Sequence, residues 1–146
     1  MKLDKPLVAA LFGILSTFPY ELSSRILLLF GIGKYSEYQL SSLVITLDRP
    51  TAILGFFISS ILGSTSALLF YYILGRVRSD YLIIKGIAVG LISFLFLETV
   101  FSAVIEGPGL IPFRPISDHY LHLFGAAVFG LTLGLLFKSY LYKEAD

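Results

Sequence analysis

Ionisable side chains inside long apolar stretches are the residues of this sequence with the clearest potential for chemistry. Glu21 and Arg25 lie within the apolar stretch 6–32, and Glu98 lies within the apolar stretch 82–106. A charge inside a segment that crosses a bilayer is costly and requires a partner or water, so such residues are candidates for a functional site. Their positions therefore predict a polar site between apolar segments.

The spacing of Glu21 and Arg25 allows two interpretations. Residues four apart on a helix form an intrahelical ion pair, which would let an arginine exist in lipid. Alternatively, Arg25 also holds Glu98 or an anionic ligand through bidentate hydrogen bonds. Glu98 has no basic neighbour on its own segment. It is either a carboxyl group that pairs with a neighbouring helix or with Arg25, or a functional carboxylate.

His119 and His122 begin the last apolar segment and lie three residues apart. They would share one face of a helix. With carboxylates from other segments, such as Glu21 or Glu98, two imidazoles would complete a ligand shell of the Zn or Fe type. In the alternative interpretation, Asp118 caps the helix and both histidines lie at the level of the lipid head groups. Paired metal-binding histidines on a helix more often lie four residues apart, which favours the alternative.

Other catalytic signatures are absent from the sequence. No glycine-rich phosphate loop and no G-x-S-x-G motif occur. The chain has no cysteine, which excludes thiolate metal ligands and cysteine nucleophiles. Serine and threonine in helices usually bond a backbone carbonyl of their own helix, so none is assigned as a nucleophile. The sequence leaves any cofactor undefined and favours a function other than catalysis. With a net charge of +1, no nucleic-acid partner is expected.

Four apolar segments must position these residues. The chain has 146 residues, of which 56% are hydrophobic and 14% charged, whereas soluble domains carry about 25% charged residues. Such a short soluble domain could not bury this much apolar surface, so we expect the chain to lie in a lipid bilayer. The segments, each long enough to cross, are 6–32, 50–75, 82–106 and 118–142. They predict one all-α transmembrane domain over residues 1–146, built as an integral membrane four-helix bundle.

Basic residues between the segments predict the orientation. One side of the membrane would receive most of them: Lys2, Lys5, Arg76, Arg78, Lys85, Lys138 and Lys143. The other side would receive Lys34, Arg49 and Arg114. Because cytoplasmic loops carry the excess of lysine and arginine, both termini are predicted to be cytoplasmic.

The first outer loop, 33–49, is predicted to contain a short helix. Its motif Ser36-Glu37-Tyr38-Gln39 fits a capping box, and apolar residues follow at helical spacing. We expect an amphipathic helix that lies on the outer membrane surface. The second outer loop, 107–117, contains three prolines and cannot continue a helix.

Small residues recur in steps of four on each segment. The stripes are Ala9, Gly13 and Thr17; Gly55, Ser59, Gly63 and Ala67; Gly86 and Gly90; and Ala126, Gly130 and Gly134. Such stripes let helices approach closely in lipid, although glycine and alanine are common in membrane helices anyway. Their repetition favours stripes that face inward. In the outer half the same faces carry Glu21, Arg25, Glu98 and His122, which predicts an outward-facing polar pocket lined by these four residues.

The C-terminal half of the chain also carries a pattern that is typical of a known family. Residues 69–76 (LFYYILGR), Lys85-Gly86, residues 120–125 (YLHLFG) and Gly130 resemble the YqhR-like four-helix membrane proteins of Gram-positive bacteria. The resemblance covers about half of the chain and does not include the first segment. It implies a multi-pass protein of the inner (plasma) membrane and assigns no activity.

Three functions remain as hypotheses. The first is binding or permeation of a small solute, an ion or a lipid head group through the outward-facing pocket, with a homo-oligomer where a full pathway is needed. The second is an accessory or scaffold subunit that docks a larger membrane-protein partner. The third is an intramembrane metal-dependent enzyme that uses His119 and His122. The sequence favours them in that order.

Overall fold

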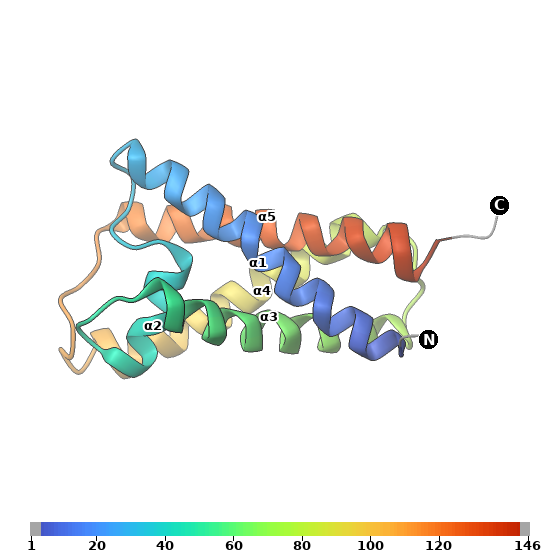
Figure 1. Ribbon diagram of the computed structural model, residues 1–146, viewed down its shortest axis with the longest axis horizontal. Helices are drawn as coiled ribbons and strands as arrows, with labels where there is room; N and C mark the ends of the chain where they lie inside the picture. The colour runs from blue at the N-terminus through green and yellow to red at the C-terminus, as the bar shows by residue number, and fades with distance from the viewer. Residues whose placement is uncertain (1–3, 144–146) are drawn as a thin grey trace.

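The structure, a computed structural model, describes residues 4–143 as helices joined by loops (Figure 1). Its helices are α1 (Lys5–Leu29), α2 (Glu37–Thr46), α3 (Ala52–Leu74), α4 (Leu82–Phe101) and α5 (Ile116–Leu136). A π-helical turn extends α4 (η1, Ser102–Glu106) and α5 (η2, Phe137–Leu141). Within the described residues, four helices are long and apolar enough to cross a membrane. This confirms the predicted all-α class of membrane protein, although α1 ends three residues earlier than expected.

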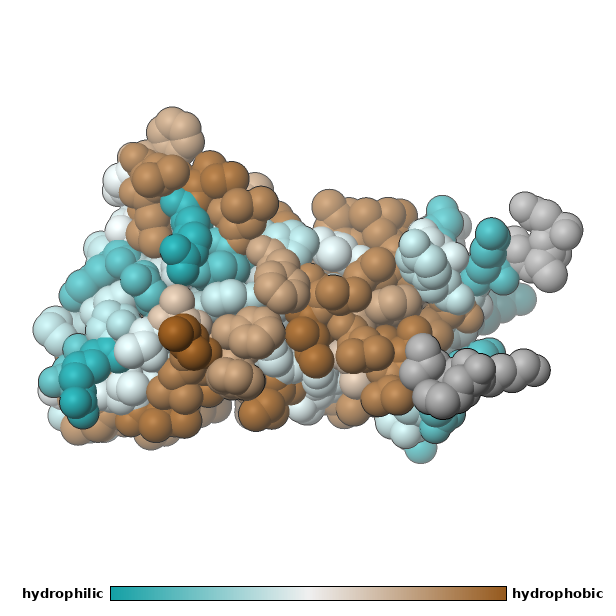
Figure 2. Space-filling model, in the orientation of Figure 1, coloured by the Kyte–Doolittle hydropathy of each residue, from teal (hydrophilic) through white to brown (hydrophobic). Residues whose placement is uncertain are grey.

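The long helices run side by side, with α2 and two loops at one end, which we call the α2 end (Figure 1). The beginning of α1 and the end of η2 lie together at the opposite end. Lys2, which contributed to the predicted orientation, lies outside the described residues. On the face shown in Figure 2, hydrophobic residues cover the middle of the molecule and hydrophilic residues lie mainly towards its two ends. This distribution suits a protein that spans a bilayer.

The predicted small-residue stripes face inward and form two close helix contacts. Between α4 and α5, a Cβ added to Gly86 would lie 2.8 Å from the Cα of Gly134. Between α1 and α3, a Cβ added to Gly63 would lie 2.7 Å from the carbonyl oxygen of Gly13. Both distances are too short for a side chain, so the backbones approach as closely as glycine permits. Close approach of this kind lets helices pack in lipid, where apolar surface gives no drive to associate.

The short helix α2 begins as predicted and packs against α3. Its capping box is present, because Ser36 Oγ accepts from the Gln39 N–H and Gln39 Oε1 accepts from the Ser36 N–H. The helix packs against α3, where Gly55 leaves room for the carbonyl group of Tyr38. Its location at the outer membrane surface stays a prediction. Buried hydroxyl groups of α2 reinforce the contact with α3, since Ser41 bonds to Ser59 and Ser42 accepts from the Thr51 N–H.

Candidate functional site

A cavity of about 340 Å³ lies between α3 and α4 at the α2 end of the bundle. Residues of α1 and α5 form its floor, and apolar side chains of α3 and α4 form its walls. The lining residues that are exposed at the surface are Val44, Val100, Val104 and Leu110. The mouth therefore lies between α2 and the end of α4, and it is apolar. Ligand pockets commonly measure about 300–1,000 Å³, so the cavity is large enough for a small ligand.

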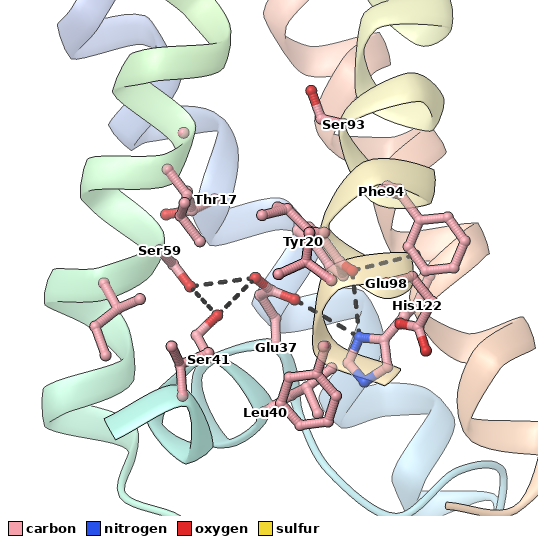
Figure 3. Close-up of a pocket in the computed structure, with 18 of the residues that line it drawn as sticks. Thr17, Tyr20, Glu37, Leu40, Ser41, Ser59, Ser93, Phe94, Glu98 and His122 are labelled. Carbon is pink, nitrogen blue, oxygen red and sulfur yellow. Dashed lines mark hydrogen bonds and ion pairs between the residues drawn. The ribbon is translucent and has the colours of Figure 1, made fainter. Parts of the chain in front are cut away.

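A row of polar side chains crosses the floor of the cavity from α3 to α5 (Figure 3). We call Ser59, Ser41, Glu37, Tyr20 and His122 the polar row. Ser41 Oγ and Ser59 Oγ donate to Glu37 Oε1 over 3.0 and 3.2 Å. On the other side, His122 Nδ1 lies 3.6 Å from Glu37 Oε2 and 3.2 Å from the Tyr20 hydroxyl. Glu37 thus lies at the centre of the polar row, hydrogen-bonded to the two serines and in ion-pair distance of His122, in an otherwise apolar cavity.

Contacts with α1 hold the first turn of α2, and with it Glu37, in place. Glu21 Oε2 accepts from the Tyr38 N–H over 2.9 Å, and Ser24 Oγ accepts from the Glu37 N–H over 3.1 Å. A carboxylate at a helix N-terminus satisfies N–H groups that have no partner within the helix and complements the helix dipole. Glu21 therefore serves to position α2 rather than to line the cavity.

The carboxyl group of Glu37 favours its ionised form despite being partly buried. Burial by itself raises the pKa of a carboxyl group, because desolvation disfavours the charge. For Glu37 this effect is outweighed by His122 and by the hydroxyl groups of Ser41 and Tyr20, and its pKa lies below the ordinary value. The cavity therefore presents a carboxylate to a ligand.

A second polar group, which we call the Arg114 cluster, closes the α2 end and consists of Arg114, Glu98, Glu106 and Asp118. Arg114 Nε donates to Glu106 Oε1 and Nη1 donates to Asp118 Oδ2, each over 2.9 Å, and Nη2 also bonds Glu98. The side chain of Arg114 is fully buried. Burial opposes its charge, but Glu106 and Glu98 raise its pKa above the ordinary value. Each nitrogen of the guanidinium group thus bonds a carboxylate.

Asp118 also joins the two loops of the α2 end. Its Oδ1 accepts from the backbone N–H groups of Lys34 and Tyr35, over 2.7 and 3.0 Å, while its Oδ2 accepts from Arg114. Asp118 does not cap its own helix through its side chain, as the alternative interpretation of the histidines supposed, since the N-cap position belongs to Pro115. It anchors the connection between α1 and α2 to the start of α5.

The structure brings together two of the four residues predicted to bind a ligand. Glu98 and His122 line the cavity, whereas Glu21 and Arg25 do not. Arg25 Nε instead donates to Glu21 Oε1 over 2.5 Å, which is the predicted intrahelical pair. Glu98 pairs with Arg114 and not with Arg25. The expected bidentate contact between Arg25 and Glu98 is therefore absent.

The two histidines have different partners. His119 Nδ1 lies 2.7 Å from Glu98 Oε1, and His122 belongs to the polar row. Across residues 4–143 there is no group of three or more histidine and acidic side chains placed to hold a metal ion. The predicted metal site at His119 and His122 accordingly gains no third ligand.

Two central residues of the site were not predicted from the sequence. Glu37 appeared only as part of a capping motif, and nothing in its spacing indicated that α2 folds into the bundle. Arg114 appeared only as a basic residue of an outer loop. Its spacing of four from Asp118 was the available signal, because residues four apart at the start of a helix can pair.

Comparison with known proteins adds no further identification. No family model, curated protein or solved structure matches this chain. The resemblance to the YqhR-like proteins therefore stays a prediction from the motifs of the C-terminal half.

Proposed function

We propose that this protein binds a small amphiphile, a molecule with a polar head and an apolar chain, in the cavity between α3 and α4. The observation that supports the proposal is the combination of apolar walls, an apolar mouth and a polar row across the floor. An apolar chain would occupy the walls, and a head group would bond to Glu37, Tyr20 or His122. This is a narrower form of the function favoured by the sequence, with a lipid head group in place of a water-soluble solute.

The route into the cavity also supports an amphiphile. The exposed residues at the mouth are apolar and belong to α2, to the end of the α4 span and to the loop that follows it. A water-soluble ligand would gain nothing from such an entrance, whereas a lipid-like molecule already dissolved in the bilayer would pass from acyl chains to apolar side chains. The hydrophobic effect does not oppose this transfer.

Photolabelling tests the proposal. Protein in phosphatidylcholine nanodiscs is irradiated with a long-chain alcohol that carries a diazirine in its chain, and the labelled residues are mapped by mass spectrometry. We expect labels to concentrate on cavity residues such as Leu62, Phe94 and Leu97. Ser93→Leu should reduce this labelling to the level of other lipid-facing sites, because the larger side chain fills the cavity.

The matched control is Thr65→Leu, a polar-to-leucine change on the exposed face of the neighbouring helix α3. It should leave cavity labelling unchanged. Labels spread evenly over exposed residues such as Ile53 and Ile61, in both the unmodified protein and Ser93→Leu, would contradict the proposal.

A second candidate function is that of an accessory subunit. Among the four spans, that of α4 is the least buried within the chain, and it exposes Ile84, Ile92, Leu95 and Phe96. A larger membrane protein could cover this face, although acyl chains would do so equally well. Purification in mild detergent distinguishes the accessory subunit from the binding function. A stoichiometric partner that is lost on Leu95→Ser would favour the subunit, and a partner-free protein would favour the binding function.

A further inference from the structure

The carboxylates at the cavity have acceptor positions that the protein does not use. Glu37 Oε1 accepts from two serines, while within residues 4–143 Oε2 has His122 Nδ1, 3.6 Å away, and the Tyr20 hydroxyl lies close to the same carboxylate. For Glu98, Oε1 contacts Arg114 and His119, and no donor within residues 4–143 forms a hydrogen bond with its Oε2. An ionised carboxylate offers about four acceptor sites on its two oxygens. Both groups therefore have room for a further donor.

The lysine and arginine side chains near the site do not reach the cavity. No lysine or arginine is among the lining residues. The Arg114 side chain has no exposed surface and is held by three carboxylates. Arg25 is paired with Glu21 on α1. A negatively charged head group would thus find no lysine or arginine partner in the cavity.

The net charge of the site is negative, which also disfavours an anionic head group. The polar row and the Arg114 cluster contain the carboxylates of Glu37, Glu98, Glu106 and Asp118. Their basic partners are the guanidinium group of Arg114 and the imidazoles of His119 and His122. With all four carboxylates ionised and both imidazoles protonated, one negative charge is left over. In a cavity with apolar walls this charge acts over a longer range than in water.

On the basis of the proposed function, we infer that the amphiphile carries a cationic head group of the primary-ammonium type, with Glu37 Oε2 as its main acceptor. An ammonium group has three donors and no acceptor, which complements a site rich in acceptors. Glu98 adds negative potential at the same cavity, and the Tyr20 hydroxyl supplies a neutral contact. A phosphate or carboxylate head would meet the excess negative charge, and the one basic side chain of the described lining, His122, already faces Glu37 and Asp118.

The test uses three photoreactive probes of identical chain, with an ammonium, a hydroxyl or a carboxylate head. Each is added to the full-length protein in phosphatidylcholine nanodiscs at the same measured mole fraction in the bilayer. Cavity labelling by the ammonium probe should exceed that by the alcohol about tenfold, as expected for a hydrogen bond to a charged group. The carboxylate probe should label less than the alcohol.

Glu37→Gln assigns the preference to one residue. The glutamine carbonyl can still accept from Ser41 and Ser59, but it carries no charge. Labelling by the ammonium probe should fall to the level of the alcohol, while labelling by the alcohol stays unchanged. The control is Asp48→Asn, at an exposed carboxylate outside the cavity. It should change neither the labelling by the ammonium probe nor the labelling by the alcohol.

The outcomes separate this inference from the proposed function. Equal cavity labelling by the ammonium and alcohol probes would overturn the inference and leave amphiphile binding in place. A preference that persists in Glu37→Gln would also overturn it. Absence of cavity labelling by any probe would contradict the proposed function itself. The comparison of head groups in the unmodified protein stands even if Glu37→Gln fails to fold.

Discussion

At the scale of single residues, the Arg114 cluster shows how charges persist in an apolar protein. Arg114 bonds Glu106 through both its guanidinium group and its backbone N–H, and its carbon Cζ lies 4.8 Å from the ring centre of Phe101. Charge-assisted hydrogen bonds of this kind are short and directional. They replace the water that each group would lose on burial, so the cluster fixes the two loops of the α2 end relative to α4 and α5.

The first prediction at this scale concerns Arg114. Arg114→Met should lower the free energy of unfolding by about 3–5 kcal/mol, because buried carboxylates lose their counter-ion. Arg114→Lys should retain part of the stability, since the charge remains but the planar fork of donors is lost. The measurement is unfolding in detergent micelles, followed by circular dichroism.

The control for that measurement is Arg49→Met, in an ion pair whose two side chains are about four-fifths exposed (84% and 78%). Exposed pairs contribute at most about 1 kcal/mol, so little change is expected. Equal losses in Arg114→Met and Arg49→Met would mean that the cluster does not stabilise the fold.

At the scale of elements, glycines determine which helices touch. Close α4–α5 and α1–α3 contacts leave α3 and α4 apart at the α2 end, where the cavity lies. Towards the middle of the bundle, Ser93 Oγ donates to Ser66 Oγ over 3.2 Å and joins α3 to α4. The cavity thus results from two tight pairs of helices whose other faces meet only in part.

The second prediction tests the glycine contact. In Gly86→Ala the new methyl group would overlap the backbone of α5, and we expect a loss of about 1–3 kcal/mol in the free energy of unfolding. Gly75→Ala is the matched control, because Gly75 has an ordinary helical φ of −64° and the nearest atom to an added Cβ is 3.3 Å away. If Gly86→Ala left the free energy of unfolding unchanged, α4 and α5 would be able to separate at no cost.

At the scale of the whole molecule, the distribution of basic residues bears on the orientation. The loops of the α2 end carry the basic residues Lys34, Arg49 and Arg114. At the opposite end lie Lys5, Arg76, Arg78, Lys85, Lys138 and Lys143. Because cytoplasmic loops carry the excess of lysine and arginine, this asymmetry favours the predicted orientation with the α2 end outside.

The third prediction tests this orientation. The chain has no native cysteine, so single-cysteine variants need no further changes. Asp48→Cys should react with a membrane-impermeant maleimide in intact cells that express the protein. Val77→Cys, on the half-exposed loop at the opposite end, should react only after permeabilisation. The reverse pattern would invert the proposed topology.

The amino-acid sequence by itself determined the class of the protein and the inward faces of its helices. Apolar length identified the four spans, and the four-residue period of small residues selected the faces that pack, because both depend only on helical geometry. The start of α2 was equally predictable, since a capping box is a contact within four residues. The same local rules placed Glu98 and His122 on inward faces, and both residues line the cavity.

Only the tertiary structure decided the partners of the charged residues. Periodicity places a side chain on a helix face, but it does not give the rotation of one helix against another or the path of a loop. Arg114 therefore replaced Arg25 as the partner of Glu98, and Glu37 entered the cavity because Glu21 and Ser24 of α1 draw α2 into the bundle. Contacts between residues distant in the chain depend on the packed backbone, which no short sequence pattern encodes.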